Sequence, residues 1–183
     1  ENVFPYFKDT SIQAIYFYGS GCIPEKVPAV REAIHSSFPV EVIEVNSDLV
    51  ATAHALCGRQ PGIACILGTG SNSCEWDGTQ IVKQIPSLGF ILGDEGSGAS
   101  LGKQLVNEAL KERLTPGLKE AFLEEYQLTQ ALIIEKVYRE PFPSRFLASL
   151  SPFLLKHIGD PTIHRLVHQS FSDFFERNVM RYD

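Results

Sequence analysis

Long apolar runs and an excess of basic residues are both missing from this sequence of 183 residues. No stretch of about 18 apolar residues occurs, so no transmembrane helix is expected. Lysine and arginine total 16, against 22 aspartates and glutamates, and the net charge of −6 argues against nucleic acid as a partner. Residues 1–5 carry no basic stretch, so no signal peptide is expected. These features predict a cytoplasmic protein that meets small molecules and has no nucleic-acid or membrane partner.

The spacing of the four cysteines fits no metal or redox motif. The four cysteines contain no C-x-x-C pair, which excludes zinc-ribbon and thioredoxin-type sites. They are expected to be reduced thiols. The positions concerned are Cys22, Cys57, Cys65 and Cys74. The G-x-S-x-G motif of α/β-hydrolases is also absent.

The first half of the sequence alternates between strand and helix patterns. Strands are predicted at 12–18, 40–45 and 63–67. Helices are predicted at 25–38 and at 47–57, the second with a serine N-cap and a glycine stop. The run at 63–67 is continuously apolar, which is typical of a strand buried on both faces. This order predicts an α/β layer with parallel strands.

A hairpin and then a helical half follow. Strands at 71–76 and 79–82 flank Asp77-Gly78, a favoured type I′ turn pair. Beyond about residue 98 the apolar spacing is helical throughout. Helices are predicted at 99–113, 118–126, 130–138, 145–157 and 162–181. The last of them carries no stop signal.

The loop after the third strand has the composition of a phosphate-binding loop. Its glycines, Gly68 and Gly70, allow the backbone to approach an anion closely. Thr69 and Ser71 add hydroxyl donors to the backbone N–H groups. The loop matches neither G-x-x-x-x-G-K-[ST] nor G-x-G-x-x-G. A glycine-rich entry to the hairpin is the structural alternative, and spacing alone leaves both open.

Two aspartates lie where a helix is predicted to begin. Asp94 lies in the glycine-rich run before the helix at 99–113, and Asp48 lies where a strand ends and the next helix begins. Ligands of open α/β sheets bind outside such strand ends. An ionised carboxylate there can orient a substrate hydroxyl and accept its proton. Either aspartate is also able to act only as a helix cap, and for Asp48 the position alone favours the cap.

Three segments together resemble one family. V-N-S-D (45–48), I-L-G-T-G-S-N (66–72) and L-G-F-I-L-G-D-E-G-S (88–97) follow the order and spacing found in N-acetylglucosamine kinases. These kinases belong to the BadF/BadG/BcrA/BcrD ATPase group, in the actin-like and hexokinase-like sugar-kinase superfamily. The segment P-F-P-x-R-F-L (141–147) is also similar to bacterial members. The resemblance covers nearly the whole chain.

The resemblance implies a ribonuclease-H-like, actin/hexokinase-type α/β fold of two domains with ATP between them. It assigns 1–90 to the remainder of an N-terminal α/β domain and 91–183 to the helical part of a C-terminal domain. The first phosphate loop (D-G-G/S-T-K-T) and the closing adenosine motif of the family are not in the sequence. We therefore expect this chain to be an internal portion of a longer protein, with an incomplete fold and little activity alone.

The same resemblance implies roles for individual residues. Asp48 would accept the proton of the sugar 6-hydroxyl during transfer from Mg²⁺–ATP. The loop residues that would hold ATP are Gly68, Thr69 and Gly70. The residues that would face the sugar are Ser71, Asn72, Ser87, Leu88, Gly89 and Asp94. Leu88 replaces a tryptophan of animal members, so aromatic contacts are not carried over.

Other expectations remain open at this stage. No residue is assigned as a metal ligand, and the family analogy allows a homodimer. The sequence does not separate N-acetylglucosamine from N-acetylmannosamine, glucosamine or N-acetylmuramate. Two other functions stay open: an ATPase that activates a dehydratase through an iron–sulfur cluster, and a sugar sensor without catalysis.

Overall fold

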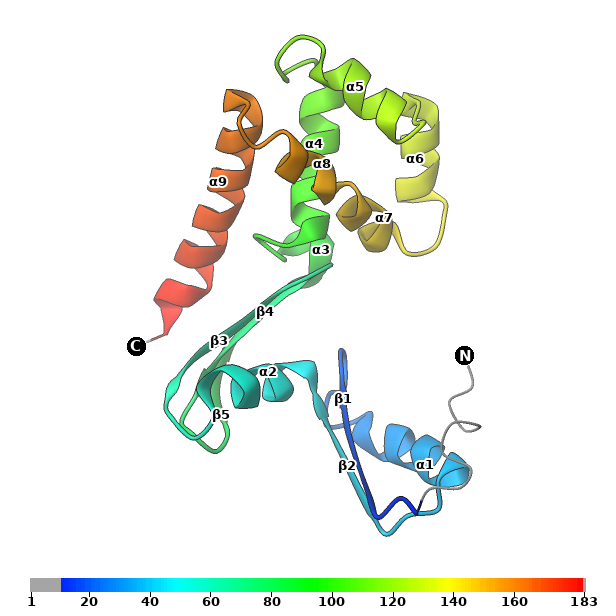
Figure 1. The fold of residues 1–183 in the computed structure, drawn as a ribbon, viewed down its shortest axis with the longest axis vertical. Helices are drawn as coiled ribbons and strands as arrows, with labels where there is room; N and C mark the ends of the chain where they lie inside the picture. The colour runs from blue at the N-terminus through cyan, green and yellow to red at the C-terminus, as the bar shows by residue number, and fades with distance from the viewer. Residues whose placement is uncertain (1–10, 183) are drawn as a thin grey trace. The chain divides into compact units, whose positions relative to one another are not determined.

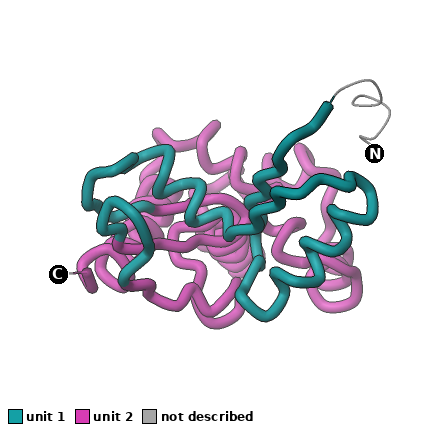
Figure 2. Tube along the Cα trace, turned by 90° about the horizontal axis from the view of Figure 1, so that it is seen from below, with its two compact units in different colours: residues 1–64, 76–82 teal, residues 65–75, 83–183 magenta. Residues whose placement is uncertain are grey.

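The computed structural model describes residues 11–182, drawn as a ribbon in Figure 1. Residues 1–5, where no signal peptide is expected, lie outside the described part. The chain divides into two compact units, residues 1–64 with 76–82 and residues 65–75 with 83–183 (Figure 2). The fold is mixed α/β, as predicted. The domain boundary predicted after residue 90 stays a prediction.

A β-α-β element opens the first unit. Strand β1 (Ala14–Gly19) pairs in parallel with β2 (Val42–Ser47), and α1 (Val27–Ser37) connects them. The register places Ala14 opposite Val42 and Gly19 opposite Ser47. A parallel pair requires a crossover of this kind. The prediction of parallel strands is confirmed for this pair, whereas the third strand of the predicted layer, at 63–67, lies in a separate sheet.

Helix α2 (Asp48–Cys57) begins and ends where its sequence signals predict. The Ser47 hydroxyl accepts a hydrogen bond from Val50 N, and Gly58 follows the last turn with a φ of 58°. Trp76, only 2% exposed, donates from Nε1 to the Gly58 carbonyl at 3.0 Å. The helix is thus fixed at both ends.

Strands β3 (Gly62–Leu67), β4 (Ser71–Trp76) and β5 (Ile81–Ile85) form a three-stranded sheet in that order. The predicted burial of β3 on both faces is wrong: Ile63 is 41% and Leu67 is 47% exposed. Within residues 11–182, β3 is an edge strand of this sheet, so fewer neighbours cover it.

The hairpin turn between β4 and β5 differs from the predicted type. A type I′ turn needs positive φ at both central residues, but of Asp77 and Gly78 only the glycine has it, at 103°. Asp77 Oδ1 instead accepts hydrogen bonds from the N–H groups of Thr79 (2.7 Å) and Gln80 (2.8 Å). The side chain closes the turn and frees Asp77 from a strained conformation. These bonds, led by that from Gln80, hold the pKa of Asp77 below its usual value.

The second unit contains the helical half. Its helices are α3 (Gly89–Leu92), α4 (Gly98–Leu110), α5 (Leu118–Glu125), α6 (Gln130–Tyr138), α7 (Pro143–Ser149), α8 (Ser151–Lys156) and α9 (Pro161–Arg177), followed by a 3₁₀ turn (Val179–Arg181). None of the helices within residues 11–182 is long and apolar enough to cross a membrane.

Three of the predicted helices differ from the structure. The helix expected at 99–113 ends at Leu110. The helix expected at 145–157 is divided at Leu150 into α7 and α8, because Pro152 lies in the first turn of α8, where its missing N–H is tolerated. The last helix ends at Arg177 and not at 181. The N–H of Asn178 bonds to Phe174 O, and the backbone then turns into the 3₁₀ segment.

Tyr182 ties the end of the described chain to the hairpin. Its hydroxyl lies 2.7 Å from Ser73 Oγ, and it accepts a hydrogen bond from Ile85 N at 3.1 Å. Ser73 is fully buried and Tyr182 is 8% exposed. A buried hydroxyl pair is stable only when both members find partners, which this arrangement supplies.

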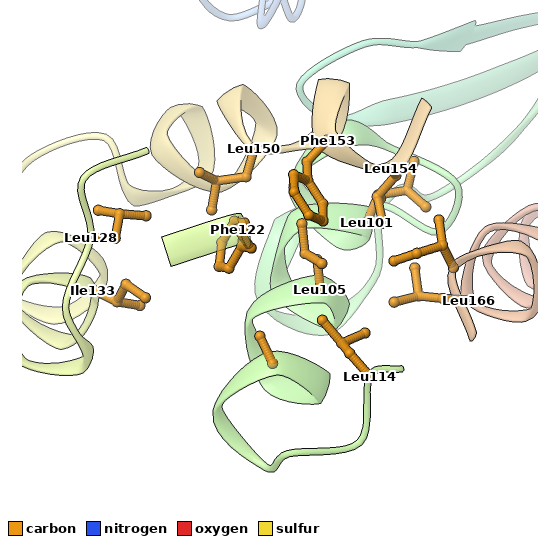
Figure 3. Close-up of a cluster of buried hydrophobic side chains, with 12 residues drawn as sticks. Leu101, Leu105, Leu114, Phe122, Leu128, Ile133, Leu150, Phe153, Leu154 and Leu166 are labelled. Atoms are coloured by element: carbon orange, nitrogen blue, oxygen red, sulfur yellow. The ribbon is translucent and has the colours of Figure 1, made fainter. Parts of the chain in front are cut away.

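The core of the second unit surrounds α4 (Figure 3). The rings of Phe122 and Phe153 meet edge to face with centroids 5.4 Å apart, and Leu105 lies beside them (Figure 3). The buried members are Leu101, Leu105, Ala109, Leu114, Phe122, Leu128, Ile133, Leu150, Phe153, Leu154, Ile163 and Leu166. They come from α4, α5, α6, α8, α9 and the loops between them.

Gly102 sets how closely α4 approaches α7. A Cβ at this position would collide with the carbonyl oxygen of Leu147. We expect Gly102→Ala to lower the free energy of unfolding by about 1–3 kcal/mol, because the helices must move apart. Urea unfolding measures the change. Gly159→Ala is the control, since nothing lies within 4 Å of a Cβ there, and equal stability of the two variants would contradict the prediction.

Candidate functional site

The predicted phosphate loop is held against the beginning of α4. Gly68 N donates to Gly70 O at 2.9 Å and closes the loop. The first N–H groups of the helix, on Gly98 and Ala99, donate to the carbonyls of Gly68 (2.8 Å) and Thr69 (3.0 Å). N–H groups that a helix cannot satisfy internally thus fix the position of the loop.

The loop leaves its own donors unused. The N–H groups of Thr69 and Gly70 and the Thr69 hydroxyl make no hydrogen bond within residues 11–182. Successive free N–H groups form a concavity that binds anions, and the adjacent helix N-terminus adds a partial positive charge. This arrangement can hold a phosphate group.

A cavity of about 550 Å³ lies beside the loop. We call it the loop cavity: Gly68 and Thr69 line it from the loop, Arg145 and Ser149 from α7, and Phe171 from α9. The Arg145 side chain is exposed and makes no ion pair within the described residues. An unpaired guanidinium beside free N–H donors favours a phosphorylated ligand.

Residue-by-residue sequence reasoning missed Arg145 and Ser149 as site residues. Arg145 belongs to the P-F-P-x-R-F-L segment at 141–147, so the resemblance did contain a signal for it. Nothing local indicated that α7 would lie beside a loop some seventy residues earlier in the chain.

Asp94 packs against the same loop. Its carboxylate Oδ1 accepts a hydrogen bond from Ser71 N at 3.3 Å, and its own N–H donates to Ser87 O at 2.9 Å. A Cβ on Gly70 would lie 2.9 Å from Asp94 Oδ2, so only glycine leaves room for the carboxylate. Asp94 is 8% exposed and has a φ of 55°. The structure therefore brings together four predicted site residues, Gly70, Ser71, Ser87 and Asp94.

The alternative that Asp94 is merely a helix cap does not fit this geometry. Ser97 is the residue that caps α4, since its hydroxyl accepts from Ser100 N at 3.1 Å. Burial raises the pKa of Asp94, the Ser71 N–H bond opposes the rise, Glu95 adds to it and Lys103 opposes it. A buried carboxylate in a left-handed conformation costs stability and is typical of functional sites.

Asp94→Asn is expected to raise the free energy of unfolding at pH 7. Asparagine keeps an acceptor for Ser71 N and tolerates positive φ, but it carries no charge to bury. Because the folded pKa is raised, the cost of the carboxylate is absent below about 3.8, the unfolded value, and grows as pH rises through the folded pKa. Urea midpoints at pH 7 and below 3.8 measure the difference. Glu176→Gln, on the exposed face of α9, controls for net charge, and an Asp94→Asn gain that does not shrink at low pH would contradict the prediction.

Asn72 has a fixed side-chain orientation. Its Oδ1 accepts hydrogen bonds from Ser73 N (2.9 Å) and from Gln84 Nε2 (3.0 Å). A backbone N–H can only donate, so the neighbouring atom of Asn72 is its oxygen. The Asn72 amide nitrogen has no partner within the described residues, which leaves it free to donate to a ligand.

Ser87, Leu88 and Gly89 are predicted to face the sugar, and we call them the sugar strip. They lie between strand β5 and the first turn of α3. Leu88 is 63% exposed and has a φ of 61°. The strip is followed on α3 by Ile91 and Leu92, which are 72% and 74% exposed. An exposed apolar side chain here is available to contact a ligand, but it offers no ring.

Asp48 belongs to the first unit, whereas the other predicted site residues belong to the second. Ser47, and not Asp48, is the N-cap of α2. Asp48 Oδ1 accepts from Leu49 N at 3.0 Å, and its second oxygen has no partner within residues 11–182. The carboxylate is half-buried and has an oxygen free to accept a proton.

Metal-ligating groups are not clustered in the described part of the chain. No three His, Cys, Asp or Glu side chains between residues 11 and 182 are placed to hold a metal ion. None of the four cysteines forms a disulfide within the described residues, and burial raises the pKa of the Cys65 thiol.

The solved structures that this chain resembles include two candidate kinases. A candidate N-acetylglucosamine kinase from Porphyromonas gingivalis matches 98% of this chain with 54% identity and a TM-score of 0.96. A candidate N-acetylglucosamine kinase from Chromobacterium violaceum matches 95% with 25% identity and a TM-score of 0.71. The chain spans 65% of the first protein and 63% of the second. No protein-family model and no curated protein matches it.

Proposed function

We propose that this chain is part of an ATP-dependent kinase that phosphorylates an N-acetylated amino sugar at its 6-hydroxyl, with N-acetylglucosamine as the leading candidate. The observation that carries the proposal is the loop at Gly68–Gly70, which has unused donors and packs against the Asp94 carboxylate. The likeness to two candidate N-acetylglucosamine kinases supports it. The proposal includes the ribonuclease-H-like fold and a cytoplasmic location, where ATP is abundant.

The free donors of the loop and the neighbouring Asp94 carboxylate suggest two ligands. Thr69 and Gly70 would bind ATP phosphates, and Arg145 would neutralise part of their charge from the loop cavity. Magnesium would arrive with ATP as part of the substrate, because Mg²⁺ keeps several waters and binds mainly through phosphates. No protein cage of carboxylates is needed for it.

The sugar would meet donors and acceptors suited to hydroxyl and amide groups. Asp94 would accept from sugar hydroxyls, and the free Asn72 amide nitrogen would donate to a sugar oxygen. Asp48 would accept the proton of the 6-hydroxyl as that oxygen attacks the γ-phosphate. The assigned roles of Ser71, Ser87, Leu88 and Gly89 remain part of the same proposal.

The test is ADP release from Mg²⁺–ATP by the natural protein that contains this chain. We expect turnover with N-acetylglucosamine and none with its 6-deoxy analogue, which lacks the proposed acceptor. Parallel assays with N-acetylmannosamine, glucosamine and N-acetylmuramate define the specificity. ATP hydrolysis indifferent to every sugar would favour a dehydratase activator, and sugar binding without ADP release would favour a sensor. Either result would overturn the proposal that the protein is a sugar kinase.

A further inference from the structure

A second cavity, of about 450 Å³, lies between α4 and α9 in the second unit. We call it the basic cavity, because Lys103, Arg113 and Arg165 line it. The only carboxylate in its lining within the described residues is Glu108. It shares no lining residue with the loop cavity, so it is not part of the site described above.

The charges of the basic cavity do not cancel. Glu108 Oε2 lies 3.4 Å from Arg113 Nε, so this carboxylate balances the charge of one of the three cations. Arg165 makes no ion pair within residues 11–182, and Lys103 donates only to the carbonyl of Phe90 at 2.9 Å. Arg165 therefore keeps an unpaired charge, whereas the charge of Lys103 also acts on Asp94, whose pKa it lowers, on a chain whose net charge is −6. A cavity lined by three cations and one carboxylate attracts an anion such as a phosphate group.

We propose that the basic cavity binds a phosphate monoester of a small hydroxylated molecule, such as a phosphorylated monosaccharide. A guanidinium pairs with phosphate through two parallel hydrogen bonds, which Arg165 is free to make. Gln104 and Asn107 also line the cavity and supply amide groups for hydroxyls. The volume lies within the range of small-molecule sites. A cavity of this size, on an acidic chain, does not suit a long polyanion.

Lys103 connects the basic cavity to the predicted sugar strip. Its Nζ holds the carbonyl of Phe90 in α3, which follows Leu88 and Gly89 directly. A bound phosphate would compete with that carbonyl for the ammonium group. Anion binding would therefore loosen α3 and weaken sugar binding, a consequence that rests on the proposed function.

The binding test is isothermal titration of the full protein with N-acetylglucosamine 6-phosphate, at fixed ionic strength and with N-acetylglucosamine saturating. We expect saturable binding that Arg165→Gln weakens about tenfold, the value of one charged hydrogen bond. Glu108→Gln should tighten it, because the cavity loses its carboxylate. Arg139→Gln, which removes an exposed cation after α6, should leave it unchanged.

Three results would overturn the site: no saturable binding, equal affinity for inorganic phosphate, or binding that Thr69→Val abolishes and Arg165→Gln does not. The last would place the anion at the phosphate loop. ADP release is not measured, so a protein without kinase activity can still pass.

The coupling to α3 has its own readout in hydrogen exchange. The Gly93 amide bonds to Gly89 O at 2.8 Å across α3. Anion binding and Lys103→Gln should each speed its exchange, since both free the Phe90 carbonyl. Unchanged exchange in either arm would overturn the coupling.

Discussion

Asp48→Asn is expected to lower the kcat of the proposed sugar kinase by about 10²–10⁴-fold, the usual contribution of a general base. Asparagine retains an acceptor for Leu49 N, so α2 should still begin at the same residue. Its amide cannot take the proton of the attacking hydroxyl. Sugar affinity should therefore change little while turnover collapses, and ADP release together with sugar titration separates the two.

The matched control for Asp48→Asn is Glu44→Gln. Glu44 is an exposed carboxylate on β2, and its neutralisation changes the net charge by the same amount. Full activity is expected in this variant. If Asp48→Asn turned over as fast as Glu44→Gln, Asp48 would not be the base, even if the protein proved to be a sugar kinase.

Gly70→Ala is expected to lower kcat/KM for Mg²⁺–ATP by about 10²-fold. The new Cβ would lie 2.9 Å from Asp94 Oδ2, so the loop must shift to make room. A misplacement of about 1 Å in a positioning element can cost a factor of this size. The unfolding free energy should also fall by about 1–3 kcal/mol, because a side chain is forced into an occupied space.

The interaction between Gly70 and Asp94 can be measured with a double-mutant cycle. Asp94→Gly removes the carboxylate and suits the positive φ of 55°, so it should restore the stability of Gly70→Ala. It should not restore sugar binding, because the proposed acceptor is gone. Gly68→Ala is the stability control, since its Cβ would meet only Gly70 O at 3.9 Å. Additive effects of the two substitutions on stability would show that they do not interact.

Local signals predicted much of the fold because their physical causes are local. Ser47 and Gly58 mark the ends of α2, and the structure confirms both. The turn at Asp77-Gly78 was predicted at the right place but with the wrong backbone, because the Asp77 side chain competes for the turn N–H groups. The division of α7 from α8 was missed although Pro152 is visible in the sequence.

The site was predictable only in part, because its contacts join distant segments. The Ser71–Asp94 hydrogen bond joins residues 23 apart, and Arg145 reaches the loop cavity from α7. Periodicity and capping carry no information on such contacts. The resemblance supplied the order of the motifs, which is why Asp94 was named as a site residue. The sequence does not predict the basic cavity, because nothing in the local pattern indicates that Lys103 and Arg165 line the same cavity.

The Tyr182 hydroxyl also sets an order of events during protein synthesis. Its partner Ser73 leaves the ribosome 109 residues earlier, and Ile85 leaves it 97 residues earlier. The helices of the second unit are built from nearby residues and can form as they emerge. The hairpin, in contrast, cannot gain its last hydrogen bonds until the tyrosine has been made. For that interval Ser73 and Ile85 lack their native partner, so the contacts that tie the hairpin to the second unit are completed only after its helices have emerged.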